Sequence, residues 1–153
     1  MKAIIQRVSR AKVTVDGKIT TASAGPAGEI GKGILILLGV THSDTEKDVG
    51  YLVDKISNLR IFPSEKSEFD QSVLEVNGSL LVVSQFTLYG STKKGRRPDF
   101  IEAAKPEQAE EMYNLFVEKA RAIGLTVETG QFRAMMEVEL VNDGPVTLMV
   151  ESR

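Results

Sequence analysis

The positions of apolar residues along the chain predict two helices. The first begins at Ser43, whose Ser-x-x-Glu spacing to Glu46 is a capping box. The second begins at Pro106, because proline suits the first position of a helix, and ends before Gly124. Apolar residues three or four positions apart form the core face of each helix. These faces comprise Val49, Leu52, Val53, Ile56 and Leu59 in the first helix and Ala109, Met112, Tyr113, Phe116, Val117, Ala120 and Ile123 in the second.

Short runs of apolar or alternating residues predict the strands. They cover residues 3–7, 12–15, 34–38, 73–76, 80–87, 125–128, 135–141 and 146–150. Asn77-Gly78 favours a hairpin between two of these strands. Residues 20–33 are rich in Gly, Ala, Ser and Thr, so they predict a hairpin with a long loop.

The order of strand, helix, strands, helix and strands is typical of an α+β fold. We expect mostly antiparallel β-sheets that form a barrel-like core, with the two main helices packed on it. With 153 residues the chain is long enough to bury a full core, and no repeat or linker divides it. We therefore expect a single domain over residues 1–153.

The composition is that of an ordinary soluble globular protein, with 42% hydrophobic and 26% charged residues. No run of about 18 apolar residues occurs, so we expect no segment that spans a membrane. The apolar stretch within residues 1–7 is too short for a signal peptide. These features predict a cytoplasmic protein.

Two absences narrow the chemistry of the chain. It contains no cysteine, so it has no thiol nucleophile, disulfide or thiolate metal site. His42 is the only histidine, and a Ser-His-Asp arrangement would have to use it, although an exposed loop is the commoner place for such a residue. Because zinc sites need several His or Cys ligands, we expect no zinc site. An enzyme built from this chain works without the usual pair of nucleophile and base.

Four cations occur within five residues of a chain whose net charge is −2. They are Lys93, Lys94, Arg96 and Arg97. Such a run is usually a solvated loop, but beside an active site it can bind phosphates through ion pairs and counterion release. Both interpretations stay open from the residues alone.

Two further segments are candidates for a functional site. The apolar run at residues 80–83 leads directly into Ser84-Gln85-Phe86-Thr87. A strand end of this kind either presents polar groups and backbone N–H donors to a cleft, or bonds its hydroxyls to neighbouring backbone. Gly144-Pro145 lies between two strand-like runs. Base rates favour an ordinary trans-proline turn, whereas a cis peptide bond would turn the two flanking carbonyls to the same side.

Four segments together resemble the D-aminoacyl-tRNA deacylase family. They are residues 1–8 (MKAIIQRV), 84–89 (SQFTLY), 94–98 (KGRRP) and 142–147 (NDGPVT), in the family's order and at similar separations. The resemblance covers essentially the whole chain. It implies a homodimeric hydrolase, without a cofactor, that cleaves the ester between a D-amino acid and the 3′-terminal adenosine of tRNA. The same family removes glycine mischarged onto tRNA(Ala).

The resemblance also implies roles for individual residues. Ser84 and Gln85 line the pocket for the terminal adenosine, and the backbone N–H groups of Phe86 and Thr87 form an oxyanion hole. Gly144-Pro145 is a cis motif that one subunit inserts into the other's active site, where its carbonyls leave no room for an L side chain. The ribose 2′-hydroxyl of the substrate assists the reaction. An older proposal makes Thr87 the nucleophile.

The resemblance also implies roles for further single positions. Arg7 matches the arginine that supports the Gly-Pro segment; without the resemblance it would be a surface charge at a strand edge. Phe132 and Met136 match residues that line the pocket, although they suit an ordinary core equally well. Arg133 departs from the small residue, often glycine, at that position in the family, so we expect a different pocket rim. The basic run at residues 93–97 would contact the tRNA acceptor stem.

Three functions are compatible with these features. The first is an esterase that acts on D-aminoacyl-tRNA. The second is a catalytically silent RNA-binding dimer, which the intact segment 84–87 and Gly144-Pro145 disfavour. The third is an unrelated small-molecule esterase with Thr87 as its nucleophile, for which the sequence offers no partner base.

Overall fold

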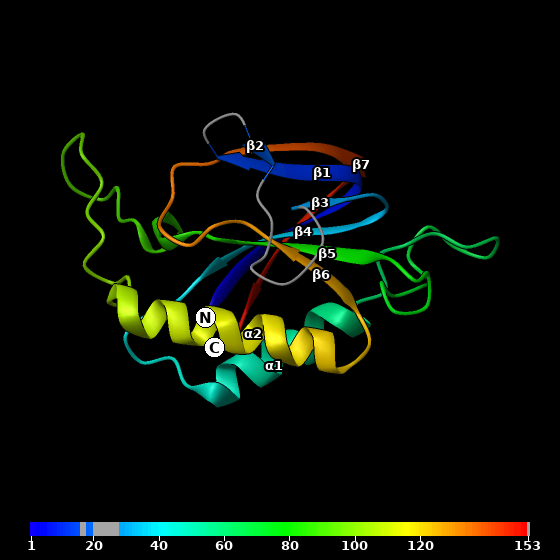
Figure 1. Cartoon of the computed structure of the whole chain (residues 1–153), viewed down its shortest axis with the longest axis horizontal. Helices are drawn as coiled ribbons and strands as arrows, with labels where there is room; N and C mark the ends of the chain where they lie inside the picture. Colours follow the sequence, from blue (N-terminus) through cyan, green and yellow to red (C-terminus); the bar gives the residue numbers. More distant parts are fainter. Residues whose placement is uncertain (16–17, 20–27, 153) are drawn as a thin grey trace.

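A computed structural model describes residues 1–15, 18–19 and 28–152 of the chain. The elements run in the order β1 (Lys2–Val15), β2 (Lys18–Ile19), β3 (Glu29–Ile30), β4 (Gly33–Gly39), α1 (Glu46–Asn58), β5 (Ser79–Ser84), the 3₁₀ helix η1 (Phe86–Tyr89), α2 (Pro106–Ala122), β6 (Thr126–Thr129) and β7 (Glu137–Glu151). Figure 1 shows the two α-helices side by side against one side of the sheet. Within the described ranges, no helix is long and apolar enough to cross a membrane. Most of the loop expected at residues 20–33 lies outside those ranges.

The strands form one mixed sheet that curls into a nearly closed barrel. Its main path runs β2-β1-β4-β5-β6, and both β3 and β7 also pair with β1. Strand β1 is antiparallel to each of its partners, whereas the pairs β4–β5 and β5–β6 are parallel. The predicted α+β fold, mostly antiparallel and barrel-like with two helices in a single domain, is confirmed.

The prediction of a strand at residues 73–76 is wrong. Residues 73–77 form consecutive turns, and Asn77 has a φ of +50°, a conformation that asparagine tolerates. The side chains of Ser72 and Glu75 each accept a hydrogen bond from the other's backbone N–H. Because these local bonds satisfy backbone N–H groups of the segment, it needs no partner strand. Strand β5 therefore enters the sheet parallel to β4 instead of folding back as a hairpin.

The first helix starts later than predicted. Its N-cap is Thr45 rather than Ser43, and the capping box is completed by Asp48. The carboxylate of Asp48 accepts hydrogen bonds from the N–H of Thr45 at 2.8 Å and from its hydroxyl at 2.9 Å. A capping box is thus present two positions further along, with aspartate in place of glutamate. The second helix begins at Pro106 as predicted, and Gly124 follows its end with a φ of +95°.

Strands β1 and β7 are each continuous, where the sequence predicts two shorter strands in each case. Residues 143–146 of β7 stand opposite Arg7 alone, because the pairs on either side are Gln6–Thr147 and Val8–Asn142. This large bulge contains Gly144-Pro145, whose peptide bond is cis. The bulge therefore displays the Gly-Pro segment from the middle of a regular strand pair.

The sheet carries a core on each face. The helix-side core lies between the sheet and the two helices, and the barrel core lies on the opposite face. Strand β1 contributes Ala3 and Ile5 to the helix-side core, but Ala11 and Val13 to the barrel core. Successive strand residues point to opposite faces, so four odd-numbered positions would share one face in a regular strand. The bulge in β1 between Val8 and Arg10 therefore switches its face, and such a bulge also bends the strand.

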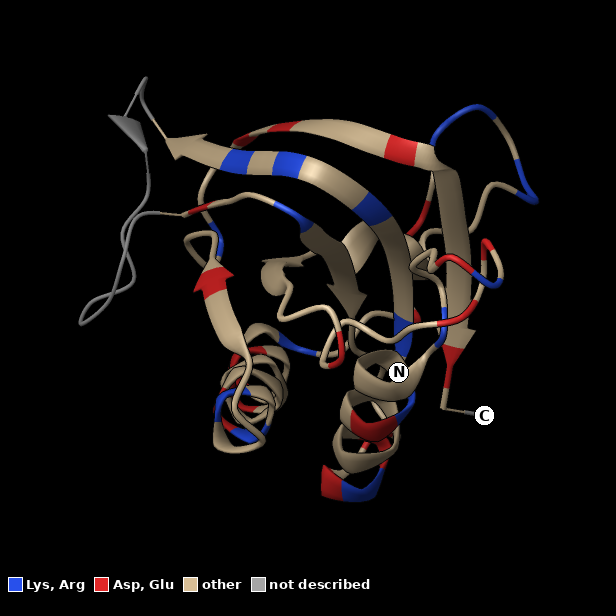
Figure 2. Cartoon of the chain, turned by 90° about the vertical axis from the view of Figure 1, so that its right-hand side faces the viewer, with Lys and Arg blue, Asp and Glu red and all other residues tan. Residues whose placement is uncertain are grey.

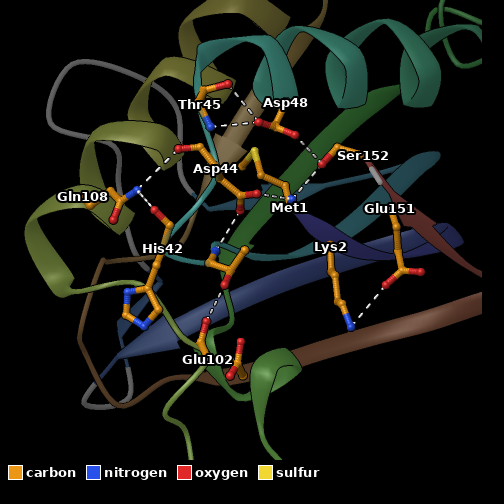
Figure 3. Close-up of polar contacts among 11 residues, drawn as sticks. Met1, Lys2, His42, Asp44, Thr45, Asp48, Glu102, Gln108, Glu151 and Ser152 are labelled. Atoms are coloured by element: carbon orange, nitrogen blue, oxygen red, sulfur yellow. Dashed lines mark hydrogen bonds and ion pairs between the residues drawn. The ribbon is translucent and has the colours of Figure 1, made fainter.

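Both ends of the described chain are tied to the start of α1 (Figure 3). The α-ammonium of Met1 donates to Oδ1 of Asp44 at 2.6 Å and to Oγ of Ser152 at 2.8 Å. Ser152 donates in turn to Oδ1 of Asp48 at 2.8 Å. The ion pair between Met1 and Asp44 is fully buried. Nothing in the hydrophobic pattern predicts this ion pair.

Glu128 is a buried carboxyl group whose ionisation the folded state disfavours. It lies on β6 opposite Leu81, a residue of the barrel core, and is 2% exposed. Among the described residues, its Oε2 has no hydrogen-bond partner. Burial raises the pKa of Glu128, and the positive charge of Arg121 opposes this shift only in part.

We expect the free energy of unfolding to fall as the pH rises from the ordinary glutamate range through the raised pKa of Glu128. In this window the unfolded chain has released the proton and the folded chain still holds it, so rising pH favours unfolding. Glu128→Gln cannot ionise and should lose this fall. Urea-unfolding midpoints measured between about pH 4 and 8 check the prediction. Glu118→Gln, at an exposed position on α2, is the control. The same pH profile of unfolding in Glu128→Gln and in wild type would contradict the prediction.

Candidate active site

The end of β5 and the helix η1 form the centre of the candidate site. Ser84 pairs in register with Leu38 of β4, and the N–H of Gln85 makes a last bond to the Leu38 carbonyl at 2.8 Å. The chain then leaves the sheet, and the N–H of Leu88 closes a turn on the Gln85 carbonyl at 3.2 Å. The strand predicted over residues 80–87 therefore ends at Ser84, and its polar continuation is a 3₁₀ helix.

A largely apolar pocket of about 400 Å³ opens beside the start of η1. The structure brings Ser84, Gln85 and Phe86 together with Phe132 in its lining, as the resemblance implies. The remaining lining comes from β4 and the residue that follows it, from α2, and from the segment between η1 and α2, together with Arg133. These residues are Leu38, Val40, Phe100, Ala103, Ala104, Pro106, Ala109 and Tyr113. An apolar hollow with a few polar groups at one edge is the usual form of a small-ligand site.

The backbone N–H groups of Phe86 and Thr87 lie at the start of η1, where a helix leaves its first N–H groups without intrahelical acceptors. Within the part of the chain that the structure describes, neither group donates a hydrogen bond to a protein acceptor. The hydroxyl of Thr87 accepts a hydrogen bond from Nε2 of Gln85. Phe86 lines the pocket, and Thr87 follows it in the chain without lining the pocket. Two free donors at this edge can stabilise negative charge that develops on a bound carbonyl oxygen.

Two aromatic residues of the pocket were not predicted as site residues. The sequence places Tyr113 only on the core face of α2, but its ring packs against Phe132 with centroids 5.9 Å apart. Its hydroxyl donates to the Val82 carbonyl at 2.8 Å, and burial raises the pKa of the phenol far above its ordinary value, so Tyr113 stays protonated. Phe100 meets Phe86 edge to face at 5.0 Å. In the sequence, Phe100 is marked only as an aromatic residue shortly after the basic run.

Arg133 and Met136 occupy different environments. Arg133 lines the pocket and has a φ of +62°, a left-handed conformation that glycine adopts most readily. The backbone geometry thus explains why a small residue suits this position. Met136 is absent from the pocket lining; it packs against the barrel core, with its sulfur 2.7 Å from where a Cβ at Gly130 would lie.

His42 lies in an exposed loop, as predicted, and does not line the pocket. Its Nε2 is 2.7 Å from the carbonyl oxygen of Ile101. Its own carbonyl accepts a hydrogen bond from Nε2 of Gln108 at 3.0 Å (Figure 3). The only histidine is therefore not paired with Thr87.

Arg7 is a buried support of the β7 bulge rather than a surface charge. It is 7% exposed, and its Nη1 donates to the Ile61 carbonyl at 2.5 Å. Its Nε is 3.2 Å from both the carbonyl oxygen and Oδ2 of Asp143. A Cβ at Gly144 would lie 2.7 Å from Nη2 of Arg7, so the segment rests directly on the guanidinium. Gly144 and Pro145 are themselves exposed and do not line the pocket of their own chain.

The basic run lies on an exposed loop that is closed by a β-bridge between Ser91 and Asp99. All four cations are exposed. Figure 2 shows them as two blue stretches at the tip of a loop that stands out from the body of the protein. The loop leads into Phe100, which lines the pocket, so the cations are carried by a segment attached to the site.

Similar proteins identify the class to which this chain belongs. The family model for D-Tyr-tRNA(Tyr) deacylase matches residues 4–151. Relatives named D-aminoacyl-tRNA deacylase, from Bacillus cereus (strain G9842) and Bacillus mycoides (strain KBAB4), are each 54% identical over 153 residues, which is 100% of both chains. The solved structure of the c-Myc DNA Unwinding Element Binding Protein is 43% identical with a TM-score of 0.90, covering 100% of this chain and 99% of that one. A structure described as a probable eukaryotic D-amino acid tRNA deacylase shares the fold, with a TM-score of 0.79 at 17% identity over 98% of both chains.

The chain is thus a member of the tRNA deacylases. More specifically, the chain belongs to the D-Tyr-tRNA(Tyr) deacylase family, because the family model spans almost all of it and full-length relatives share more than half of its residues. The resemblance drawn from the four sequence segments is confirmed.

Proposed function

We propose that this chain hydrolyses the ester of D-aminoacyl-tRNA to a free D-amino acid and tRNA, and that it also removes glycine from mischarged tRNA(Ala). The observation that carries the proposal is the apolar pocket beside the free N–H groups of Phe86 and Thr87, in a chain of the deacylase family. The enzyme acts in the cytoplasm as a homodimer and takes no cofactor.

In the proposed reaction the terminal adenosine occupies the pocket, with its ribose near Ser84 and Gln85. Water adds to the ester carbonyl carbon, and the N–H groups of Phe86 and Thr87 stabilise the resulting oxyanion. The bond from that carbon to the ribose oxygen then breaks, which releases the amino acid carboxylate and the 3′-hydroxyl of tRNA. The ribose 2′-hydroxyl assists, because the described residues that line the pocket include no imidazole or carboxylate.

Gly144-Pro145 of the partner subunit selects the chirality of the substrate. In its own chain this segment is exposed and outside the pocket, which leaves it available to a second copy. Backbone carbonyls that face the α-carbon leave space for a hydrogen atom or a D side chain on the other side, but not for an L side chain. Because main-chain atoms make this test, the identity of the D side chain is not read.

The exposed cations at residues 93–97 contact phosphates of the tRNA acceptor stem. Their loop leads into the pocket lining at Phe100, so it lies next to the path of a nucleic-acid 3′ end. Ion pairs with phosphates release counterions, and binding should therefore weaken as salt concentration rises.

Two substrates separate the three functions considered from the sequence. The proposal predicts release of free tyrosine from D-tyrosyl-tRNA and no cleavage of a small activated ester such as p-nitrophenyl acetate. Cleavage of p-nitrophenyl acetate alone would favour a small-molecule esterase. Tight binding of D-tyrosyl-tRNA without release of tyrosine would identify a silent RNA-binding protein.

Gly144→Ala should reduce the preference for D over L substrates by at least about tenfold, or about 1.4 kcal/mol. The new Cβ would lie 2.7 Å from Nη2 of Arg7 and 3.0 Å from Cγ2 of Val146, at a φ of +117° that L residues rarely adopt, so the segment must shift. The ratio of kcat/KM for D- and L-tyrosyl-tRNA measures the effect. Gly124→Ala is the matched control, because it shares a positive φ but has no heavy atom within 4 Å of its Cβ. An equal loss of selectivity in both variants would contradict the role of this segment.

A further inference from the structure

A second hollow, of about 510 Å³, adjoins the far end of η1. The first pocket borders Phe86 at the start of this helix, and the second hollow borders Leu88 and Tyr89 at its end. At about 2 Å of rise per residue, the two ends of η1 are only about 6 Å apart along its axis. An RNA strand whose last nucleoside fills the pocket can therefore place the neighbouring nucleotide in the hollow.

Tyr89 gives this hollow a fixed aromatic wall. The helix η1 packs on Gly39 at the end of β4, where an added Cβ would lie 3.1 Å from Cβ of Leu88 and 3.3 Å from Cδ2 of Tyr89. The missing side chain at Gly39 thus lets the tyrosine ring pack closely against the end of the sheet. The ring is partly exposed. Aromatic side chains held in this way are stacking surfaces for the bases of single-stranded nucleic acids.

Two lysines line the same hollow. Nζ of Lys2 lies 5.1 Å from the centre of the Tyr89 ring. It also lies 3.2 Å from Oε1 of Glu151 (Figure 3). Both side chains of this ion pair are about a third or more exposed, so the pair is weak and Lys2 can exchange its partner for a phosphate. Lys93 comes from the basic loop. An aromatic surface flanked by cations is typical of a groove that follows a nucleic-acid backbone.

We propose that this hollow binds the penultimate nucleotide of the tRNA 3′ end, with its base stacked on Tyr89 and the phosphate that joins it to the terminal adenosine near Lys2. Asp99 and Glu102 also line the hollow, and carboxylates accept hydrogen bonds from the exocyclic amino group of cytosine. The hollow therefore suits one nucleotide with an amino-bearing base. This inference rests on the proposed function, because adenosine in the first pocket is what positions the next nucleotide.

The test compares two minimal substrates, the D-tyrosyl ester of adenosine and the D-tyrosyl ester of the dinucleotide cytidylyl-adenosine. Wild type should hydrolyse the dinucleotide ester with the higher kcat/KM, mainly through a lower KM. Tyr89→Ala should lose about tenfold or more on the dinucleotide ester, as expected for one stacked base, and retain its activity on the adenosine ester. Tyr89→Phe should keep the preference of wild type, because the stacking ring remains. Tyr51→Ala, at an exposed tyrosine of α1, is the matched control and should leave both values unchanged.

Lys2→Gln provides a second variant that leaves the aromatic wall in place. This variant should raise the KM for the dinucleotide ester but not for the adenosine ester. It should also reduce the salt dependence of the KM for the dinucleotide ester. Equal kcat/KM for the two esters in wild type would overturn the inference, as would an equal loss on both esters in Tyr89→Ala. If wild type hydrolyses neither ester, the proposed function fails as well, which is a different result from hydrolysis without a dinucleotide preference.

Discussion

Replacing the 2′-hydroxyl of the terminal adenosine by hydrogen should lower the rate of hydrolysis of D-tyrosyl-tRNA by about 10²–10⁴-fold, the usual contribution of a positioned acid or base. The described residues that line the pocket supply no acid or base that could replace the 2′-hydroxyl. Among the described lining residues the only titratable side chains are Tyr113, which burial keeps protonated, and Arg133. His42 is engaged with the Ile101 carbonyl in another loop. The proton transfers must therefore depend on the substrate and on water.

Thr87→Ala is the companion experiment to the 2′-deoxy substrate. The Thr87 hydroxyl is hydrogen-bonded by Gln85 and has no base beside it, so its loss should slow the reaction only a few-fold through altered positioning. Single-turnover rates with 3′-O-D-tyrosyl esters on ribo- and 2′-deoxy-terminated tRNA measure both effects. Full turnover on the 2′-deoxy substrate, or complete loss of activity in Thr87→Ala, would point to threonine as the nucleophile instead.

Asp44→Asn should destabilise the folded chain by about 3–5 kcal/mol, the usual cost of removing one partner from a buried ion pair. The α-ammonium of Met1 and the carboxylate of Asp44 are both fully buried and lie 2.6 Å apart. The second oxygen of Asp44 accepts a hydrogen bond from the N–H of Thr41 at 2.8 Å. An amide in its place leaves a buried positive charge without its counter-ion.

The free energy of unfolding from urea titration checks this prediction. Glu151→Gln is the matched control, because it makes the same change in the partly exposed ion pair with Lys2, whose loss should cost less than about 1 kcal/mol. Comparable stability losses in the two variants would contradict the importance of burial for the Met1–Asp44 pair.

Much of the fold could be predicted because its signals are local. The core faces of both helices follow the helical period, except that Ile123 caps the second helix and is exposed. Pro106 and Gly124 mark the ends of the second helix. The strand predicted at residues 73–76 failed because side-chain hydrogen bonds from Ser72 and Glu75 compete with sheet pairing. The parallel entry of β5 depends on that outcome, so periodicity alone could not have predicted it.

The site is less readable from the sequence because its parts meet only in the folded chain. The segment 84–87 stands out locally as a polar strand end, but Phe132 joins it from 45 or more positions away and was identified only through the family resemblance. Met136 was assigned to the pocket on the same grounds, yet it packs on the other face of the sheet. The burial of Arg7 beneath residues 143–146 depends on the register of two long strands, which no local pattern specifies.

The most direct test of the account is the ratio of kcat/KM for D-tyrosyl-tRNA and L-tyrosyl-tRNA, prepared on the same tRNA and assayed as released tyrosine. Exclusion of an L side chain by backbone atoms predicts a D preference of at least about 100-fold, which corresponds to about 2.7 kcal/mol. Equal release of tyrosine from the two substrates would contradict chiral selection.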